Sequence, residues 1–246
     1  MQKFEQLQQL RLFEHVPSEQ LARWAELFIP RRYEREERLR SEGSSSSRFI
    51  FLLDGCVKAT KWRDEQRQFM VDVFMDHQPP GNMSVYLEQP CPVSVTALDD
   101  TITLEVHRNH LVHQFEEHPK LWQGVFRQML AENRKMLRRL HEMAAAGAER
   151  RLAMLFARLA FSVGRRTRLE DGTMGVRVAL PLSRGDIAEL MNVRHETAIR
   201  YMSRWNKEGP VRTDTRGFTI VDYDKLQQLA GEADKQPPAY QNHWPG

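Results

Sequence analysis

The spacing of apolar residues changes at about position 109, and this change limits the folds that the chain can adopt. Before it, apolar and polar residues alternate in short runs, separated by turn-forming pairs such as Asp54-Gly55. The four clearest runs lie at residues 49–53, 70–74, 93–97 and 102–106. A period of two predicts antiparallel strands in a barrel or roll, whereas the later period of three to four predicts helices. The chain is therefore expected to be an α+β protein with an N-terminal antiparallel β domain.

A long amphipathic segment follows the predicted strands. Its apolar residues step by three and four over about five turns, with basic residues on the other faces. So sustained a stripe is typical of a coiled-coil seam, and its lone polar residue, Asn133, is of the kind that fixes register and oligomer state. The alternative is an ordinary helix that packs within one chain. The expected dimer seam consists of Phe126, Met129, Leu130, Asn133, Met136, Leu137, Leu140 and Met143.

Composition and charge narrow the class of protein. Of the 246 residues, 41% are hydrophobic and 28% charged, as in a folded globular protein rather than a disordered one. No apolar run approaches the roughly 20 residues of a membrane span, and residues 1–12 lack the apolar core of a signal peptide. The net charge of +3 permits a nucleic-acid partner without arguing for one. These features predict a cytoplasmic protein that does not contact a membrane.

The cysteine content points in the same direction. Cys56 and Cys91 are too few for a disulfide framework or a four-cysteine metal site, which suits a reducing compartment. Cys56 follows a glycine on a predicted strand and is expected to be buried. Cys91 lies between two prolines and is expected to be exposed.

Residues 183–208 carry the most informative pattern. Ser183 followed by Asp186 is the pattern of a capping box at a helix start. Asn192 stands where a sharp turn needs a residue that tolerates positive φ, and a second helix would begin at His195. The spacing is that of a helix-turn-helix, and residues 211–221 predict a hairpin wing. The alternative is a plain helical hairpin with a solvated charged face.

Polar side chains at the start of the second helix would face outward, as entry into a DNA major groove requires. Arg200 can donate two hydrogen bonds to guanine, and Glu196 can accept one from cytosine N4. The candidate base-contacting residues are His195, Glu196 and Arg200. The candidate DNA backbone contacts are Ser183, Arg184, Arg194, Thr197, Arg204, Thr213 and Arg216.

Several motifs resemble the CRP/FNR transcription regulators. The DNA-binding motif of that family is matched by Ser183-Arg184-Gly185-Asp186-Ile187-Ala188 and His195-Glu196-Thr197-Ala198-Ile199-Arg200. Its β-roll is matched by Leu53-Asp54-Gly55-Cys56-Val57-Lys58 and Val95-Thr96-Ala97-Leu98-Asp99. The resemblance covers nearly the whole chain. It aligns Glu196 and Arg200 with the base-reading Glu and Arg of the family, whereas His195 stands where cAMP-responsive members carry Arg.

The resemblance implies a β-roll effector domain at residues 1–118, a dimerisation helix at 119–146 and a winged helix-turn-helix domain at 147–231. Residues 232–246 are expected to be a disordered tail. The implied function is that of a homodimeric transcription regulator that binds a near-palindromic operator, with double-stranded DNA, a second copy and RNA polymerase as partners. No Ser/His/Asp order, phosphate loop or HExxH pattern rises above chance, so no enzyme activity is expected. A sensor module that acts through protein contacts is the competing hypothesis.

The effector cassette that the resemblance implies is degenerate. Cyclic-nucleotide-binding members use Gly-Glu to hold the ribose and Arg-Ser/Thr to hold the phosphate, and here Gly81-Asn82 and Cys91-Pro92 stand at those places. The carboxylate, the cation and the hydroxyl are all missing, so ordinary cAMP binding is not expected. No cofactor or metal site is predicted. The alternatives are an unfamiliar small effector, or haem held by His77, His107, His110, His113 or His118.

Overall fold

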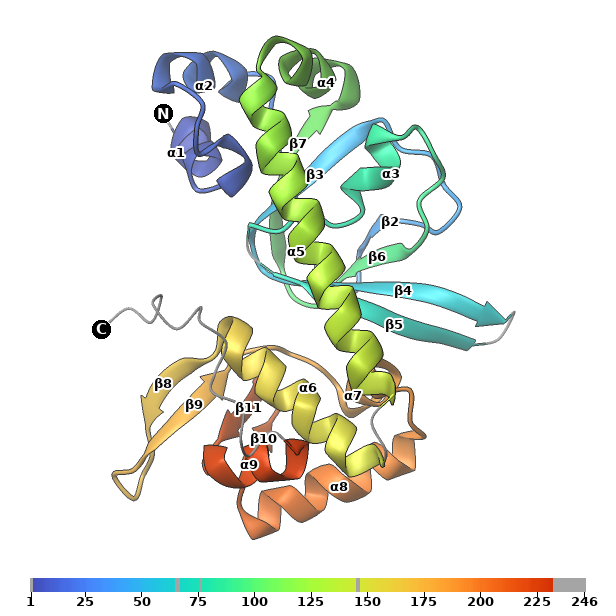
Figure 1. The fold of residues 1–246 in the computed structure, drawn as a ribbon, viewed down its shortest axis with the longest axis vertical. Coiled ribbons are helices and arrows are strands. Elements are labelled where there is room, and N and C mark those ends of the chain that lie inside the picture. Colours follow the sequence, from blue (N-terminus) through green and yellow to red (C-terminus); the bar gives the residue numbers. More distant parts are fainter. Residues whose placement is uncertain (1, 65–66, 76, 145–146, 232–246) are drawn as a thin grey trace. The chain divides into compact units, whose positions relative to one another are not determined.

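The computed structural model describes residues 2–64, 67–75, 77–144 and 147–231 (Figure 1). The chain divides into two compact units, residues 1–138 and 139–246. Both units combine helices with antiparallel sheets, which confirms the predicted α+β class. Among the described helices, none has both the length and the apolar character of a membrane span.

The first unit contains a roll of two antiparallel sheets. The first sheet has the order β1-β7-β3, with strands Ile29–Tyr33, Thr101–His107 and Arg48–Asp54. The second has the order β2-β6-β4-β5, with strands Arg38–Arg40, Ser94–Ala97, Val57–Asp64 and Arg67–Phe74. The four apolar runs seen in the sequence fall on β3, β5, β6 and β7, because alternating side chains can bury one face of each strand.

The turn between β3 and β4 requires glycine. Gly55 has a φ of 93°, in the region that L side chains avoid. A Cβ at this position would lie 2.5 Å from the carbonyl oxygen of Asp100. The expected turn at Asp54-Gly55 is therefore present, and its geometry excludes a larger residue.

Helices and the β1-β7-β3 sheet share the main core of the first unit. Helices α1, η1, α2 and α4 span Gln2–Gln8, Arg11–Phe13, Ser18–Ala25 and Arg108–Glu117. Phe13 lies at the centre of this core, and its ring contacts Trp24, Phe28 and Phe51 at centroid distances of 6.4, 5.8 and 5.8 Å. Two further helices, α3 at Asn82–Tyr86 and α5 at Pro119–Ala144, adjoin the roll.

The second unit has the architecture of a winged helix-turn-helix. Its sheet has the order β10-β11-β9-β8, with strands Val211–Asp214, Gly217–Ile220, Met174–Val178 and Arg165–Arg168. Its helices α6, α7, α8 and α9 span Ala148–Val163, Arg184–Met191, His195–Glu208 and Tyr223–Ala230. Phe156 of α6 contacts Phe218 and Trp205 at ring-centroid distances of 4.3 and 5.9 Å. This aromatic core fixes α8 against α6 and the sheet.

The predicted domain limits remain predictions. The division into compact units falls within α5, between residues 138 and 139, rather than at its two ends. The predicted tail at 232–246 lies outside the described residues.

Candidate functional site

A reciprocal capping box fixes the start of α7. The Ser183 hydroxyl accepts a hydrogen bond from the backbone N–H of Asp186 at 3.0 Å. Asp186 Oδ2 accepts from the backbone N–H of Ser183 at 2.8 Å and from its hydroxyl at 2.6 Å. The predicted capping box is therefore present, and it satisfies two donors that a helix start leaves unpaired.

Replacing Ser183 with alanine is expected to destabilise the second unit by about 1 kcal/mol, because the Asp186 N–H loses its acceptor. Denaturant unfolding followed by circular dichroism measures this change. Ser162→Ala is the matched control, since Ser162 is an exposed serine of α6 that caps no helix. Equal unfolding free energies for the two variants would contradict the role of the box.

The turn between α7 and α8 is closed by a left-handed residue. Asn192 has φ 49° and ψ 49°, as the sequence predicted. The next backbone N–H, that of Val193, donates to the carbonyl of Ala188 at 3.0 Å. The Asn192 N–H likewise donates to the carbonyl of Glu189 at 3.1 Å. These two bonds pair carbonyls at the end of α7, where the chain turns towards α8.

Helix α8 separates a buried face from a polar one. Ala198, Met202 and Trp205 are buried against the rest of the second unit. The exposed residues at and after its start include Arg194, His195, Glu196, Arg200, Arg204 and Lys207. The structure therefore brings the three candidate base-contacting residues together on the exposed first turns of one helix, and their contacts with bases stay a prediction.

The ring of Tyr201 lies beside Arg200 and Arg204. The sequence analysis did not predict these contacts. The guanidinium carbons of Arg200 and Arg204 lie 5.3 and 5.1 Å from the centroid of the Tyr201 ring. Such cation–π contacts hold a cation over the ring face. The signal in the sequence was a tyrosine flanked by two arginines one helical turn apart. The arrangement limits the orientations of Arg200 before any contact with DNA.

Glu149 of α6 ties α8 to the preceding helix. Its Oε1 accepts a hydrogen bond from Trp205 Nε1 at 2.9 Å and forms an ion pair with Arg204. Partial burial would raise the pKa of Glu149, but the bonds from Arg204 and Trp205 outweigh it and lower the pKa. The Glu149 hydrogen bond in turn raises the pKa of Arg204. Arg204 thus has a structural partner, while its predicted phosphate contact stays a prediction.

The Glu149 contacts are expected to make the second unit sensitive to acid. A carboxylate with a lowered pKa stabilises the fold fully above its ordinary pKa, about 4.3, and loses this contribution as the pH falls below it. Glu149→Gln is therefore expected to lower Tm above about pH 5, with a difference that shrinks as the pH falls below the ordinary pKa of glutamate. Thermal unfolding across this pH range measures the effect. A difference that is constant with pH would contradict it.

The predicted wing is the β10–β11 hairpin, and side chains brace it on both sides. Arg177 of β9 donates two hydrogen bonds to Asp214 at 2.6 and 2.9 Å, which lowers the pKa of Asp214. Asp214 also accepts from the backbone N–H of Arg216 at 2.8 Å, and the Arg216 side chain is exposed at the tip. The backbone N–H of Thr213 donates to Asn206 of α8 at 3.0 Å. The wing is thus held beside α8.

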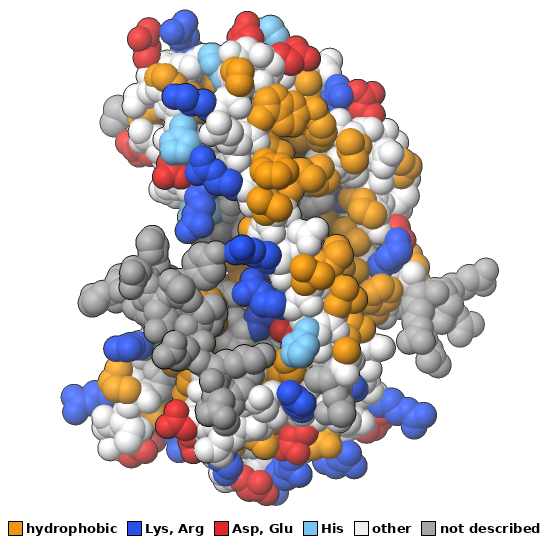
Figure 2. Space-filling view, in the orientation of Figure 1, with side chains coloured by type: hydrophobic (Ala, Val, Ile, Leu, Met, Phe, Trp, Pro, Cys, Tyr) orange, Lys and Arg blue, Asp and Glu red, His pale blue; other side chains and the backbone are white. Residues whose placement is uncertain are grey.

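The predicted seam on α5 is exposed. Its large apolar side chains have between 43% and 65% of their surface accessible, and Asn133 is exposed among them. Figure 2 shows hydrophobic side chains gathered along this helix. Exposed apolar side chains gathered in this way are typical of interaction sites, and their role as a dimer seam stays a prediction. Met129, Asn133 and Met136 of this face also line a cavity against the β-roll, so the choice between a dimer seam and packing within the chain stays a prediction.

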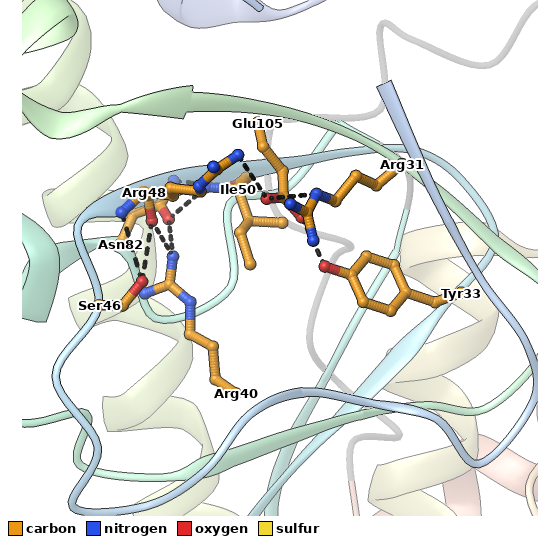
Figure 3. Close-up of polar contacts among 8 residues, drawn as sticks. All are labelled: Arg31, Tyr33, Arg40, Ser46, Arg48, Ile50, Asn82 and Glu105. Carbon is orange, nitrogen blue, oxygen red and sulfur yellow. Dashed lines mark hydrogen bonds and ion pairs between the residues drawn. The ribbon is translucent and has the colours of Figure 1, made fainter. Parts of the chain in front are cut away.

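Asn82, at the predicted ribose position, is used inside the fold. Its Oδ1 accepts from the backbone N–H of Ile50 at 2.9 Å, and its Nδ2 donates to the carbonyl of Ile50 at 2.8 Å. Both ends of the amide therefore bridge to β3 (Figure 3). Asn82 has no carboxylate that could bind a ribose, and its amide is already hydrogen-bonded to the backbone of β3.

Arg40 of β2 extends into the cassette, and sequence reasoning missed it. Its side chain donates to the carbonyl of Arg48 at 2.6 Å and to Asn82 Oδ1 at 3.1 Å (Figure 3). It also donates to the carbonyl of Gly81 at 3.0 Å. The residue is only 5% exposed, and its Nε has no hydrogen-bond partner. Burial lowers the pKa of Arg40. The roll therefore contains a cationic side chain, but its bonded N–H donors already have partners in two backbone carbonyls and the Asn82 amide oxygen.

Glu105 of β7 is a second buried charge in the roll. It accepts a hydrogen bond from the Tyr33 hydroxyl at 2.5 Å and pairs with Arg31 at 3.4 Å and Arg48 at 4.0 Å (Figure 3). Burial and Glu105 both raise the pKa of Tyr33, so the hydroxyl stays a donor. Interactions with Cys91 and, to a smaller extent, the charge of Glu105 partly offset the effect of burial on the pKa of Arg40. The network is a structural one that joins β1, β3 and β7.

The exposure predicted for Cys91 is wrong. The residue is 2% exposed, because its backbone N–H and C=O bond to residues 44 and 43, which hold the loop against the roll. A Cβ on Gly81 would lie 3.5 Å from Cys91 Sγ, so the two halves of the cassette do lie together. Pro92 is exposed, and its carbonyl accepts from Lys61 at 3.0 Å. Cys56 is buried, as predicted.

Of the candidate haem ligands, His107 and His110 lie side by side, with ring centroids 6.1 Å apart. His77, His107, His110 and His113 are exposed, and His118 is half-buried beside the Trp24 ring. Within the described residues, no group of three or more His, Cys, Asp or Glu side chains is arranged to hold a metal ion. Haem remains an untested alternative.

Two family models match the chain in tandem. A cyclic nucleotide-binding domain matches residues 30–118, and a Crp-like helix-turn-helix domain matches residues 150–229. The first match covers the β-roll and the second covers α7, α8 and the wing.

Named relatives agree with this arrangement. Electron transport regulator A of Shewanella oneidensis is 30% identical over 137 residues, which cover 56% of this chain and 53%, about half, of that protein. The CRP-like cAMP-activated global transcriptional regulator of Mycobacterium tuberculosis is 20% identical over 219 residues, 89% of this chain and 96% of that protein. The crystal structure of TTHB099, a CRP-family transcriptional regulator of Thermus thermophilus, aligns with a TM-score of 0.68 at 16% identity. The alignment covers 83% of this chain and 98% of that chain. This structural likeness shows the shared fold.

Proposed function

Since the chain belongs to the CRP/FNR family of transcription regulators, we propose that it acts as a homodimer that binds a near-palindromic DNA operator through α8. The observation that carries the proposal is the polar face of α8, where Glu196 and Arg200 are exposed above a buried Trp205. The family is one of regulators rather than enzymes. A two-fold dimer would place two such helices about 34 Å apart, in successive major grooves.

Each half-site would be recognised by three side chains. Arg200 suits guanine and Glu196 suits cytosine N4. Because both align with the base-reading Arg and Glu of the family, the resemblance implies that an inner GA-type step is retained. His195 stands at the position where Arg is found in cAMP-responsive members, which predicts a changed preference at the flanking base. The backbone contacts are proposed to come from Ser183, Arg184, Arg194, Thr197, Arg204, Thr213 and Arg216.

The dimer would form along α5, through the seam defined above. The exposed apolar side chains of that helix need a partner, and an isologous contact with a second copy supplies one. We also propose that the protein contacts RNA polymerase. Both interactions would take place in the cytoplasm. A sensor module that acts only through protein contacts is less well supported, because it leaves the polar face of α8 without a role.

Cyclic AMP is not proposed as the effector, although the M. tuberculosis relative is described as cAMP-activated. Asn82 is bonded to Ile50, and Arg40 is bonded to carbonyl oxygens, so neither is open to a ribose or a phosphate. The protein therefore either works without an effector or takes a different ligand, with haem as one further alternative.

Excess cyclic AMP is expected to leave the Tm of the purified protein unchanged. A ligand at about 100 times its Kd would stabilise the fold by about 2.7 kcal/mol and raise Tm by roughly 5–10 °C. Differential scanning fluorimetry distinguishes these results. A rise of several degrees would show that the protein binds the nucleotide and would contradict this prediction.

Selection from a randomised duplex library tests the DNA proposal. Purified, ligand-free protein, checked by its absorption spectrum for haem, is expected to select a palindromic consensus. Failure to enrich any sequence would contradict binding by the ligand-free protein.

A further inference from the structure

Tyr201 lies on α8 at the border between its buried and exposed faces. Its side chain is half-buried, whereas Trp205, one turn further along the helix, is 2% exposed. The guanidinium carbons of Arg200 and Arg204 lie 5.3 and 5.1 Å from the centroid of the Tyr201 ring. Both distances are within the range in which a ring face attracts a cation. One tyrosine ring therefore contacts two arginines of the exposed face.

The contact with the ring sets the course of the Arg200 side chain. Successive residues of a helix project about 100° apart and do not face each other. Arg200 therefore reaches the ring of Tyr201 by bending along the helix surface instead of extending straight into solvent. A free arginine side chain populates many rotamers, and the ring restricts them.

Arg204, the second arginine on the ring, is tied to the preceding helix. It pairs with Glu149 of α6, and the same carboxylate accepts a hydrogen bond from Nε1 of the buried Trp205 at 2.9 Å. This carboxylate offsets the positive charge of Arg204, which would otherwise repel Arg200 across the shared ring. Tyr201 thus packs beside an arginine that is anchored to α6.

Arg200 differs from Arg204 because no carboxylate among the described residues pairs with it. Hydrogen bonds to a carboxylate would occupy the N–H donors that guanine O6 and N7 require. A ring face instead attracts the guanidinium without accepting a strong hydrogen bond. Tyr201 can therefore orient Arg200 and leave its donors free for a base.

We propose that Tyr201 is a positioning residue that orients Arg200 before DNA binds and so increases the specificity of the site for guanine. The proposal rests on the DNA-binding function proposed above and names a residue that determines its specificity. An arginine that is ordered in advance loses less conformational entropy when it pairs with guanine. Phosphate contacts place no such demand on Arg200, so Tyr201 strengthens specific binding more than nonspecific binding.

The order of arginine side chains, measured by ¹⁵N relaxation on the full-length protein without DNA, tests the positioning directly. The Nε–H order parameter of Arg200 is expected to exceed that of Arg165, an exposed arginine of β8. Tyr201→Leu is expected to lower it to the level of Arg165, whereas Tyr201→Phe keeps the ring and is expected to preserve it. Tyr201→Met replaces the leucine variant if that variant does not fold, as judged by circular dichroism. An Arg200 side chain as mobile as Arg165 in the unchanged protein would overturn the proposal.

Base discrimination is measured with the selected operator and a duplex in which an adenine–thymine pair replaces the guanine–cytosine pair of the GA-type step in both half-sites. Tyr201→Leu is expected to reduce the ratio of the two affinities by roughly tenfold, because a ring contact is lost in each half-site. Tyr201→Phe is expected to keep the ratio within about twofold. Tyr223→Leu removes a 38% exposed tyrosine from α9 and is the matched control, with an unchanged ratio expected.

The two measurements separate this proposal from the DNA-binding function. Full discrimination by a folded variant without the ring, or an equal loss in Tyr201→Phe, would overturn the positioning role while leaving DNA binding in place. If the unchanged protein selects no operator, the DNA proposal fails, and the order parameters alone decide whether Tyr201 orients Arg200.

Discussion

Replacing Arg200 with alanine is expected to abolish selective binding to the operator. A bidentate arginine–guanine pair contributes about 1–3 kcal/mol, so the loss in a dimer with two half-sites is about 2–6 kcal/mol. Arg200 is exposed on α8 and is held over the Tyr201 ring, so its removal leaves the buried core of the helix intact. Titration of the selected operator and of an unrelated duplex measures the two affinities.

The selectivity of this loss distinguishes a base contact from a phosphate contact. Arg200→Ala is expected to weaken operator binding far more than nonspecific binding, with little change in the salt dependence. Arg165→Ala, which removes an exposed arginine from β8, is the control for lost charge. An equal loss for both duplexes would mean that Arg200 contacts the DNA backbone only.

Replacing Leu137 with aspartate is expected to separate the dimer and reduce operator affinity by about 100-fold to 10,000-fold, because linked binding of two half-sites is lost. The side chain is 61% exposed in the single chain, so a charge there costs the fold of the monomer little. In a dimer seam the same charge would be buried without a partner. Sedimentation equilibrium measures the state of association, and duplex titration measures the affinity.

The control for this substitution lies on another face of the same helix. Ala131 is exposed on α5 but does not belong to the seam, so Ala131→Asp is expected to leave both the dimer and the operator affinity unchanged. A Leu137→Asp protein that remains a dimer would show that α5 does not form the interface.

Local rules explain the elements that were predictable from the sequence. The capping box of Ser183 and Asp186 and the left-handed turn at Asn192 each depend on residues within three or four positions. The strands of the roll follow from a period of two, and the exposed polar face of α8 follows from a helical period. Such patterns specify which side chains share a face, and so they predicted the candidate DNA-contacting face.

Contacts between distant segments were not predictable in this way. Arg40 lies 41 positions before Gly81, and only the pairing of β2 within the roll brings it into the cassette. Likewise Glu149 and Arg204 are 55 positions apart and meet because α6 packs against α8. The burial of Cys91 follows from backbone bonds to residues 43 and 44. The sequence showed that the cassette lacks the residues that bind a cyclic nucleotide. It did not show that Arg40 and Asn82 are hydrogen-bonded to other parts of the roll.

The most direct test of a dimer that binds DNA through two α8 helices compares the selected palindrome with a duplex in which one half-site is scrambled. Ligand-free protein is expected to bind the intact palindrome with two chains per duplex. Scrambling one half-site is expected to weaken binding by about 100-fold or more. Equal affinity for the two duplexes, or one chain per palindrome, would contradict the proposed mode of recognition.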